Sequence, residues 1–267
     1  MRFDRTGKVS LHEIYTQPDP RAYFQTLRHL DYQVPQRAKP HFAHLLRAYR
    51  EARGVDRPRV LDIGSSYGVN AALQRCELTM DELYERYGSH TGPLTREQLL
   101  RRDRALVDSR PRPDPAHYTG LDTSGPALDY GRRAGYLDAT VHADLEHHDP
   151  TPEQRAALGA DLVVSTGCLG YVTERTLERV LAAQDGRRPW MAHFVLRMFP
   201  FRPVERLLES HGYRTETVPG VHRQRRFAST RERSQVLATM AEAGVPTEGL
   251  EDTGWLHARL HVSTPRP

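Results

Sequence analysis

The stretch from Arg59 to Leu73 constrains the fold more than any other part of the chain. A compact apolar run that contains Asp62 leads into a turn with Gly64 and Gly68, and a helix-forming segment follows. Glycines at a turn allow backbone angles that a Cβ forbids, and they let the main chain approach a ligand closely. The free N–H groups at the start of the following helix point toward the turn. The stretch therefore predicts a strand, a tight turn and a helix that cradle a nucleotide-like ligand.

The order of apolar runs and capping residues predicts an α/β fold. After a first strand at 59–63, apolar runs predict further strands at 118–122, 139–142, 160–165, 190–198, 213–218 and 255–263. Helical segments are predicted between them, at about 68–75, 125–133, 173–184, 203–210 and 230–243, together with a short helix that begins at Pro152. Such an alternation requires a mostly parallel sheet, here of seven strands, with helices on both faces.

Two helical regions lie outside this alternation. Residues 1–57 carry apolar and aromatic side chains at helical spacing and are predicted to form an N-terminal helical lid or cap. Residues 58–267 are predicted to form the core, with a helical insertion at about 77–116 in which Thr79 and Thr95 each begin a capping box. We interpret the insertion as a packing surface or a homo-oligomer contact; a substrate or partner platform and a neutral elaboration are the alternatives.

Composition excludes several classes of protein. The 267 residues are 38% hydrophobic and 27% charged, as in soluble globular proteins. No apolar run is long enough to cross a membrane and the N-terminus lacks the apolar core of a signal peptide, so we expect a cytoplasmic protein without membrane association. The two cysteines, Cys76 and Cys168, indicate neither a disulfide framework nor a zinc site, and no metal is expected. The net charge of +4 comes from widely spread arginines, which indicate no nucleic acid partner.

The run Val60-Leu61-Asp62-Ile63-Gly64-x-x-x-Gly68 resembles the first motif of class I S-adenosylmethionine-dependent methyltransferases of the small-molecule type. Ser66 stands where the family usually has a middle glycine. The resemblance covers about residues 40–265 with a break at the insertion. It implies a Rossmann-like sheet whose last strand is reversed, S-adenosyl-L-methionine as cofactor, and an N-terminal segment that closes over cofactor and substrate.

The resemblance also implies where this chain would hold the cofactor. Asp122 ends the second strand, where a carboxylate can accept from both ribose hydroxyls, and Asp144 with Leu145 follows the third strand, where the family binds adenine. The turn after Asp62 would hold the amino-acid tail. The full predicted cofactor site comprises Asp62, Gly64, Ser65, Ser66, Tyr67, Gly68, Asp122, Thr123, Asp144, Leu145, Thr166 and Gly167.

Methyl transfer is an in-line displacement with a neutral leaving group, so the enzyme aligns donor and acceptor and removes a proton where the acceptor requires it. The candidate catalytic residues are Tyr171, Tyr15 and Arg197. After the fourth strand this chain reads Ser165-Thr166-Gly167-Cys168 and lacks the Asn/Asp-Pro-Pro-Tyr motif typical of enzymes that methylate nucleic-acid bases or glutamine amides. This favours a small-molecule acceptor, such as a specialised metabolite methylated at O, N or C.

Three other functions stay open at this point. The arginine-rich stretch 222–233 is either a solvated loop or a patch with which an RNA or protein methyltransferase would bind its substrate. The five residues 64–68 also match the G-x-S-x-G elbow of serine hydrolases, with Ser66 as nucleophile. A cofactor-binding module without catalytic activity would show the same first motif.

Overall fold

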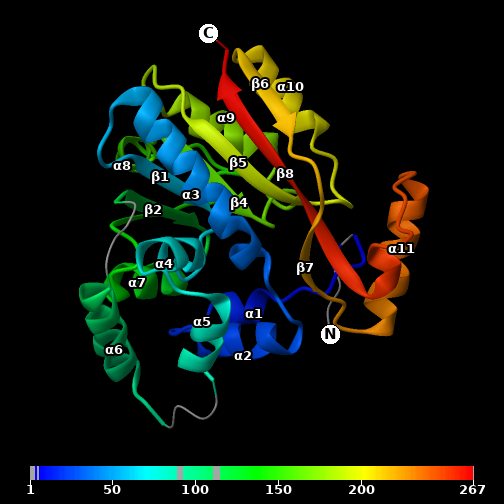
Figure 1. Ribbon diagram of the computed structural model, residues 1–267, viewed down its shortest axis with the longest axis horizontal. Coiled ribbons are helices and arrows are strands. Elements are labelled where there is room, and N and C mark those ends of the chain that lie inside the picture. Colours follow the sequence, from blue (N-terminus) through cyan, green and yellow to red (C-terminus); the bar gives the residue numbers. More distant parts are fainter. Residues whose placement is uncertain (1–3, 5, 89–92, 111–114, 267) are drawn as a thin grey trace.

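The computed structural model describes residues 4, 6–88, 93–110 and 115–266. The eight strands within these residues form one sheet, in the order β3-β2-β1-β4-β5-β8-β6, with β7 paired to β8 (Figure 1). The strands are β1 (Arg59–Ile63), β2 (His117–Asp122), β3 (Ala139–His142), β4 (Leu162–Thr166), β5 (Trp190–Leu196), β6 (Tyr213–Thr217), β7 (His222–Arg226) and β8 (Trp255–Pro265). The first five are parallel, and β8 is antiparallel to β5, β6 and β7. The predicted α/β fold with a reversed last strand is confirmed.

Helices cover both faces of the sheet because successive strand residues point to opposite sides. Val60 packs into the core on one face, together with α3 (Val34–Arg53), α4 (Val69–Arg75) and α7 (Gly125–Ala134). Leu61 packs into the core on the other face, together with α9 (Glu174–Ala182) and α10 (Arg202–Ser210). Figure 1 shows α3 across the first face, with α9 behind the sheet. Both faces are buried, as expected for a parallel sheet.

Local signals in the sequence place the helix ends. Gly54 and Gly135 are left-handed and end α3 and α7. Ser124 accepts from the Ala127 N–H at the start of α7. Capping boxes begin α5 (Met80–Arg86), α6 (Arg96–Ser109) and α8 (Pro152–Ala157). These ends follow the predicted residues closely because a cap is specified by side chains within one turn.

One strand was not predicted. His222–Arg226 forms β7 beside β8, where the sequence suggested a solvated loop or an open arginine patch. Its residues are all polar, so it shows no apolar alternation, and a register shift between Arg223 and Arg225 interrupts the pairing. The shift places Gln224 and Arg225 both in the interior. The loop interpretation was therefore wrong, and the sheet has an eighth strand.

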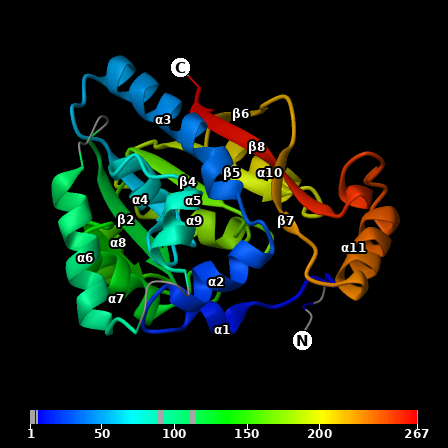
Figure 2. The same ribbon diagram turned by 60° about the horizontal axis from the view of Figure 1, so that its bottom comes forward.

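The N-terminal region and the insertion pack against each other. The short α1 (His12–Tyr15) and α2 (Arg21–His29) precede α3, and both figures place them beside α5 (Figures 1 and 2). Phe24 stacks on Tyr87 with ring centroids 4.7 Å apart, and Gln25 donates to the Tyr87 carbonyl. Of the predicted insertion, residues 89–92 and 111–114 lie outside the described residues. In the described part, its helices lie against α2 and α7.

The last helix, α11 (Thr230–Glu242), stands at the far edge of the sheet near the N-terminal segment (Figure 2). Its Val236 and Met240 pack against Leu196 and Leu256. No helix within the described residues has the length and apolar character needed to cross a membrane.

Candidate functional site

A cavity of about 440 Å³ lies at the carboxyl ends of β1 to β4. The loops that follow these four strands form its floor, as is usual for ligand sites of parallel sheets. The N-terminal segment closes the opposite side, with Tyr15, Tyr23 and Tyr32 among the lining residues, and β7 contributes Gln224 and Arg225. The turn at Gly64 therefore faces a cavity that the N-terminal segment covers on the opposite side.

The turn after β1 has the geometry of a ligand cradle. Gly64, Ser66 and Gly68 all have positive φ, of 69°, 51° and 77°. A Cβ at Gly64 would come within 2.7 Å of the Cβ of Cys168, so only glycine fits there. Ser66 adopts the left-handed conformation at the position where the resembled methyltransferases usually have glycine. A residue with a Cβ is strained in this conformation.

Asp122 is held at the end of β2 with its carboxylate facing this turn. One oxygen accepts from the Ser66 N–H at 2.8 Å and the other from the Ser124 N–H at 2.9 Å. Each carboxylate oxygen has a second lone pair, so two further donors can bind in the cavity. Burial raises the pKa of Asp122 above its usual value. The neighbouring Thr123 also lines the cavity.

Asp144 and Leu145 line the cavity after β3. The Asp144 carboxylate accepts from the Glu146 N–H at 3.1 Å and interacts with His147 Nδ1 at 2.9 Å. The Leu145 N–H has no hydrogen-bond partner among the described residues. The pair thus presents a carboxylate and a free donor side by side.

Asp62 is fully buried beneath the turn and does not line the main cavity. Its two oxygens accept from Asn70 Nδ2 at 3.0 and 3.2 Å, and the same amide donates to Thr166 Oγ1 at 3.1 Å. Burial raises the pKa of Asp62 to about 7. Asn70, Thr166 and Gly167 line the cavity, so Asp62 acts by positioning Asn70.

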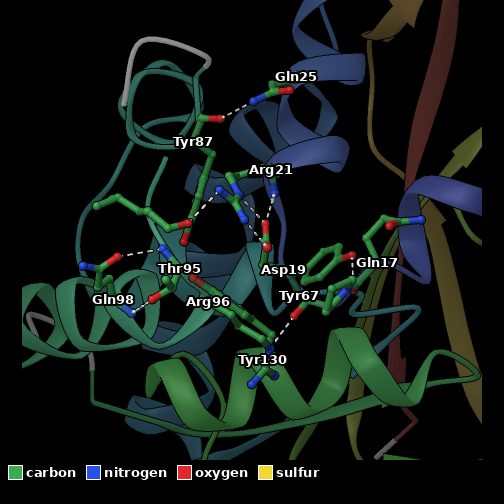
Figure 3. Close-up of polar contacts among 12 residues, drawn as sticks. Gln17, Asp19, Arg21, Gln25, Tyr67, Tyr87, Thr95, Arg96, Gln98 and Tyr130 are labelled. Carbon is green, nitrogen blue, oxygen red and sulfur yellow. Dashed lines mark hydrogen bonds and ion pairs between the residues drawn. The ribbon is translucent and has the colours of Figure 1, made fainter. Parts of the chain in front are cut away.

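Tyr67 points away from the cavity, toward the N-terminal segment. Its hydroxyl donates to the Gln17 carbonyl at 2.9 Å (Figure 3) and to the Ile14 carbonyl at 3.1 Å. Tyr67 and Gly68 are absent from the cavity lining, whereas Ser65 and Ser66 are part of it. Tyr67 therefore connects the glycine turn to the segment that covers the cavity.

The three candidate catalytic residues separate into two groups. Tyr15 and Tyr171 line the cavity, and the Tyr171 hydroxyl donates to Asp4 Oδ2 at 2.7 Å. Arg197 does not line it. Its guanidinium forms a buried ion pair with Glu251 and donates to the Pro246 carbonyl. Of the three candidate catalytic residues, Arg197 is thus the one that the structure places outside the cavity, paired with an acid of the scaffold.

The cavity also contains side chains outside the predicted cofactor-binding and catalytic residues, two of them from the arginine-rich stretch 222–233. Arg225 is buried and paired with Glu232, at 2.7 and 3.0 Å. Gln224 lies beside it, and Lys8 reaches the cavity from the N-terminal segment. For Lys8, the sequence offered one signal: lysine is rare in this chain, in which Lys8 and Lys39 are the two lysines.

The residues present fit S-adenosylmethionine. Ser66 Oγ and Gln224 Oε1 are buried at the cavity and have no hydrogen-bond partner among the described residues. Buried polar groups in proteins nearly always have partners, so orphans beside a cavity indicate a polar ligand. Together with the free lone pairs of Asp122 and the Leu145 N–H, they present both donors and acceptors. No cluster of metal-ligating side chains occurs within the described part of the chain.

Comparison with known proteins gives structural likenesses only. No protein-family model matches the chain, and no curated protein matches its sequence. The plantazolicin methyltransferase BamL is 11% identical, with 85% of this chain and 84% of that chain covered and a TM-score of 0.46. The magnesium protoporphyrin IX methyltransferase ChlM from Synechocystis PCC 6803 is also 11% identical, with 86% and 79% covered and a TM-score of 0.42. The cyclase SpnF is 13% identical, with 84% and 81% covered and a TM-score of 0.40.

At these identities and scores, the likenesses decide nothing about activity. The fold class follows from the chain itself: parallel β1 to β5 with β8 reversed between β5 and β6 is the Rossmann-like arrangement of class I methyltransferases.

Proposed function

We propose that this protein is a methyltransferase that uses S-adenosyl-L-methionine to methylate a small molecule. The observation that carries the proposal is the placement of Asp122. Its carboxylate is fixed by the Ser66 and Ser124 N–H groups, keeps a lone pair free on each oxygen, and faces the same cavity as the glycine turn.

The cofactor would lie along the strand ends. Asp122 would accept from both ribose hydroxyls, and Asp144 with the Leu145 N–H would bind the adenine edge. The turn at Gly64, with Asn70 and Thr166, would hold the amino-acid tail. When bound, the cofactor supplies a methyl group on a positively charged sulfur whose departure leaves a neutral thioether.

The acceptor would occupy the side of the cavity that the N-terminal segment covers. Aromatic and aliphatic side chains predominate there, including Tyr15, Tyr23, Leu27 and Tyr32. The rings of Tyr15 and Tyr23 meet edge to face at 5.5 Å. This apolar wall suits a small aromatic or otherwise hydrophobic acceptor. Residues 1–57 would act as the lid that excludes water from it.

The alternatives receive less support. A hydrolase requires a base within hydrogen-bond reach of Ser66, but the Ser66 hydroxyl has no partner in the described structure. An RNA or protein substrate requires an open cationic surface. Arg225 is buried and neutralised by Glu232, and Arg226 forms an ion pair with Asp31, so Arg223 is the one arginine of β7 without an acidic partner among the described residues.

The test is calorimetric titration with S-adenosylhomocysteine, which needs no knowledge of the acceptor. We expect saturable binding by the wild type and roughly 100-fold weaker binding by Asp122→Ala, because hydrogen bonds to a charged group are lost. Asp122→Asn is measured as a second variant. It keeps the shape of the side chain, so it tests the loss of the carboxylate with less risk of misfolding. Asp149→Ala removes an exposed acid that pairs with Arg179 away from the cavity and should bind normally. A folded wild type that does not bind would overturn the proposal.

A further inference from the structure

Hydrogen bonds of its backbone hold Lys8 beside the cavity. Its N–H donates to Asp4 Oδ1 at 3.1 Å, and its carbonyl accepts from the Asp4 N–H at 2.9 Å. The next residue, Val9, donates its N–H to the buried Glu232 at 2.7 Å. These contacts fix the start of the side chain, which lines the cavity with its Nζ 4.9 Å from the ring centroid of Tyr171.

The amine of Lys8 has no carboxylate to pair with. Within the described residues, no acid lies within ion-pair distance of its Nζ. The two nearest carboxylates are already engaged. Asp4 accepts from the Tyr171 hydroxyl and from Thr6, and Glu232 accepts from Arg225 and from the N–H groups of Val9 and Ala228.

Burial favours the neutral form of the Lys8 amine. Burial and the Arg225 guanidinium lower the pKa of Lys8 to about 7, against the opposing effects of Glu232 and Asp4. The pKa values of the tyrosine hydroxyls in the cavity shift upward. Burial raises the pKa of Tyr15 to about 12 and also raises that of Tyr171. At neutral pH these phenols therefore stay protonated. His12 also lines the cavity, from its exposed rim.

We propose that Lys8 is the catalytic base of the reaction and that the acceptor is a phenolic hydroxyl of a small aromatic molecule. The proposal rests on the methyltransferase function above. As the acceptor oxygen bonds to the methyl carbon, the carbon–sulfur bond breaks and its electron pair stays on sulfur. The proton of the hydroxyl passes to Nζ of Lys8, which becomes an ammonium. Gln224 and the tyrosine-rich wall would position the ring.

A direct test measures the titration of Lys8 in the wild-type protein. Lysine labelled with ¹³C at Cε gives two signals, one for each lysine, and Lys8→Met and Lys39→Met assign them. We expect the Lys8 signal to titrate near pH 7 and the Lys39 signal at higher pH. Lys39 is the matched control because its Nζ donates to the Leu78 carbonyl outside the cavity. A Lys8 midpoint close to that of an ordinary lysine would overturn the proposal.

A second test uses turnover. Methyl transfer from S-adenosylmethionine to a panel of monohydroxylated aromatics is compared for the wild type, Lys8→Met and Lys8→Arg. Loss of a general base should slow transfer on the order of 100-fold in both variants and remove the rise in rate around pH 7. An arginine variant that retains activity would show that a positive charge is needed and not a base. If no phenol is methylated, the proposed acceptor class is wrong.

The two proposals can fail separately. The titration of Lys8 needs neither cofactor nor acceptor, so it reports on the base even if S-adenosylhomocysteine does not bind. Conversely, binding of S-adenosylhomocysteine with an ordinary Lys8 midpoint would leave the methyltransferase function standing and remove Lys8 from its mechanism.

Discussion

Ser66 shows how one residue can satisfy two motifs that require different chemistry. Its left-handed backbone, with φ at 51°, serves a turn that brings the Ser66 N–H onto Asp122. A nucleophile elbow also needs an exposed hydroxyl beside a base, and this hydroxyl is buried without a partner in the described structure. The turn therefore depends on the backbone of Ser66, while its hydroxyl has no base beside it and can serve only as a hydrogen-bonding group toward a ligand in the cavity.

Replacing Ser66 by glycine tests this distinction. Glycine adopts positive φ without the strain of a Cβ, so we expect Ser66→Gly to stabilise the fold by up to about 1 kcal/mol. Binding of S-adenosylhomocysteine should persist and weaken by no more than the one hydrogen bond that the Ser66 hydroxyl can contribute, about 1 kcal/mol. Chemical denaturation and calorimetry give the two quantities. Ser65→Gly is the control, since Ser65 has no positive φ and should gain no stability. Loss of ligand binding in Ser66→Gly would contradict the proposed role of the turn.

At the scale of elements, the insertion supports the segment that covers the cavity. Arg96 at the start of α6, labelled in Figure 3, donates to the Pro18 carbonyl at 2.7 Å. It also donates to Asp129 in α7. Arg21 in α2 donates in turn to the Leu94 carbonyl at 2.9 Å. Residues from α2, α6 and the glycine turn thus meet around the chain at Gln17, as Figure 3 shows.

We predict that Arg96→Ala loosens the N-terminal segment. Loss of the bond to Pro18 should weaken binding of S-adenosylhomocysteine several-fold, by about 1 kcal/mol, and speed hydrogen exchange in residues 12–25. Mass spectrometry measures the exchange and calorimetry the affinity. Arg133→Ala is the matched control, because it removes an exposed pair with Glu97 between α7 and α6 without touching the segment. Equal effects of both variants would disprove a specific role for Arg96.

How far the sequence predicted these elements depends on how local the signal was. Gly54, Thr79 and Ser124 specify helix ends by short-range bonding, and those ends were predicted. β7 was missed because its pairing with β8 joins residues about thirty positions apart and its own residues are polar. Lys8 and Gln224 enter the cavity through contacts between the two ends of the chain, so no local pattern could place them.

At the scale of the whole molecule, the apolar face of the insertion is buried within the chain. Leu99, Leu100 and Val107 of α6 are buried, and among the described residues the one large hydrophobic side chain left exposed is Tyr171. A stable protein interface needs an extended complementary surface with an apolar centre. The described surface provides none at the insertion.

We therefore expect a monomer, in place of the homo-oligomer contact that the sequence suggested for the insertion. Light scattering coupled to size-exclusion chromatography should give the mass of a single chain, 30.5 kDa. A dimer mass that returns to one chain on charge reversal along α6, for example in Arg101→Glu, would restore the insertion as an interface.

The bond between Val9 and Glu232 also bears on biosynthesis. It joins residues 223 positions apart, so during translation Val9 can form this bond only after Glu232 has left the ribosome. Until α11 emerges, the stretch at Lys8 and Val9 lacks its bond to Glu232, whereas the residues at Ile14 and Gln17 can already bond to Tyr67 beside the glycine turn. The cofactor site could thus form before the amine of Lys8 is fixed beside it.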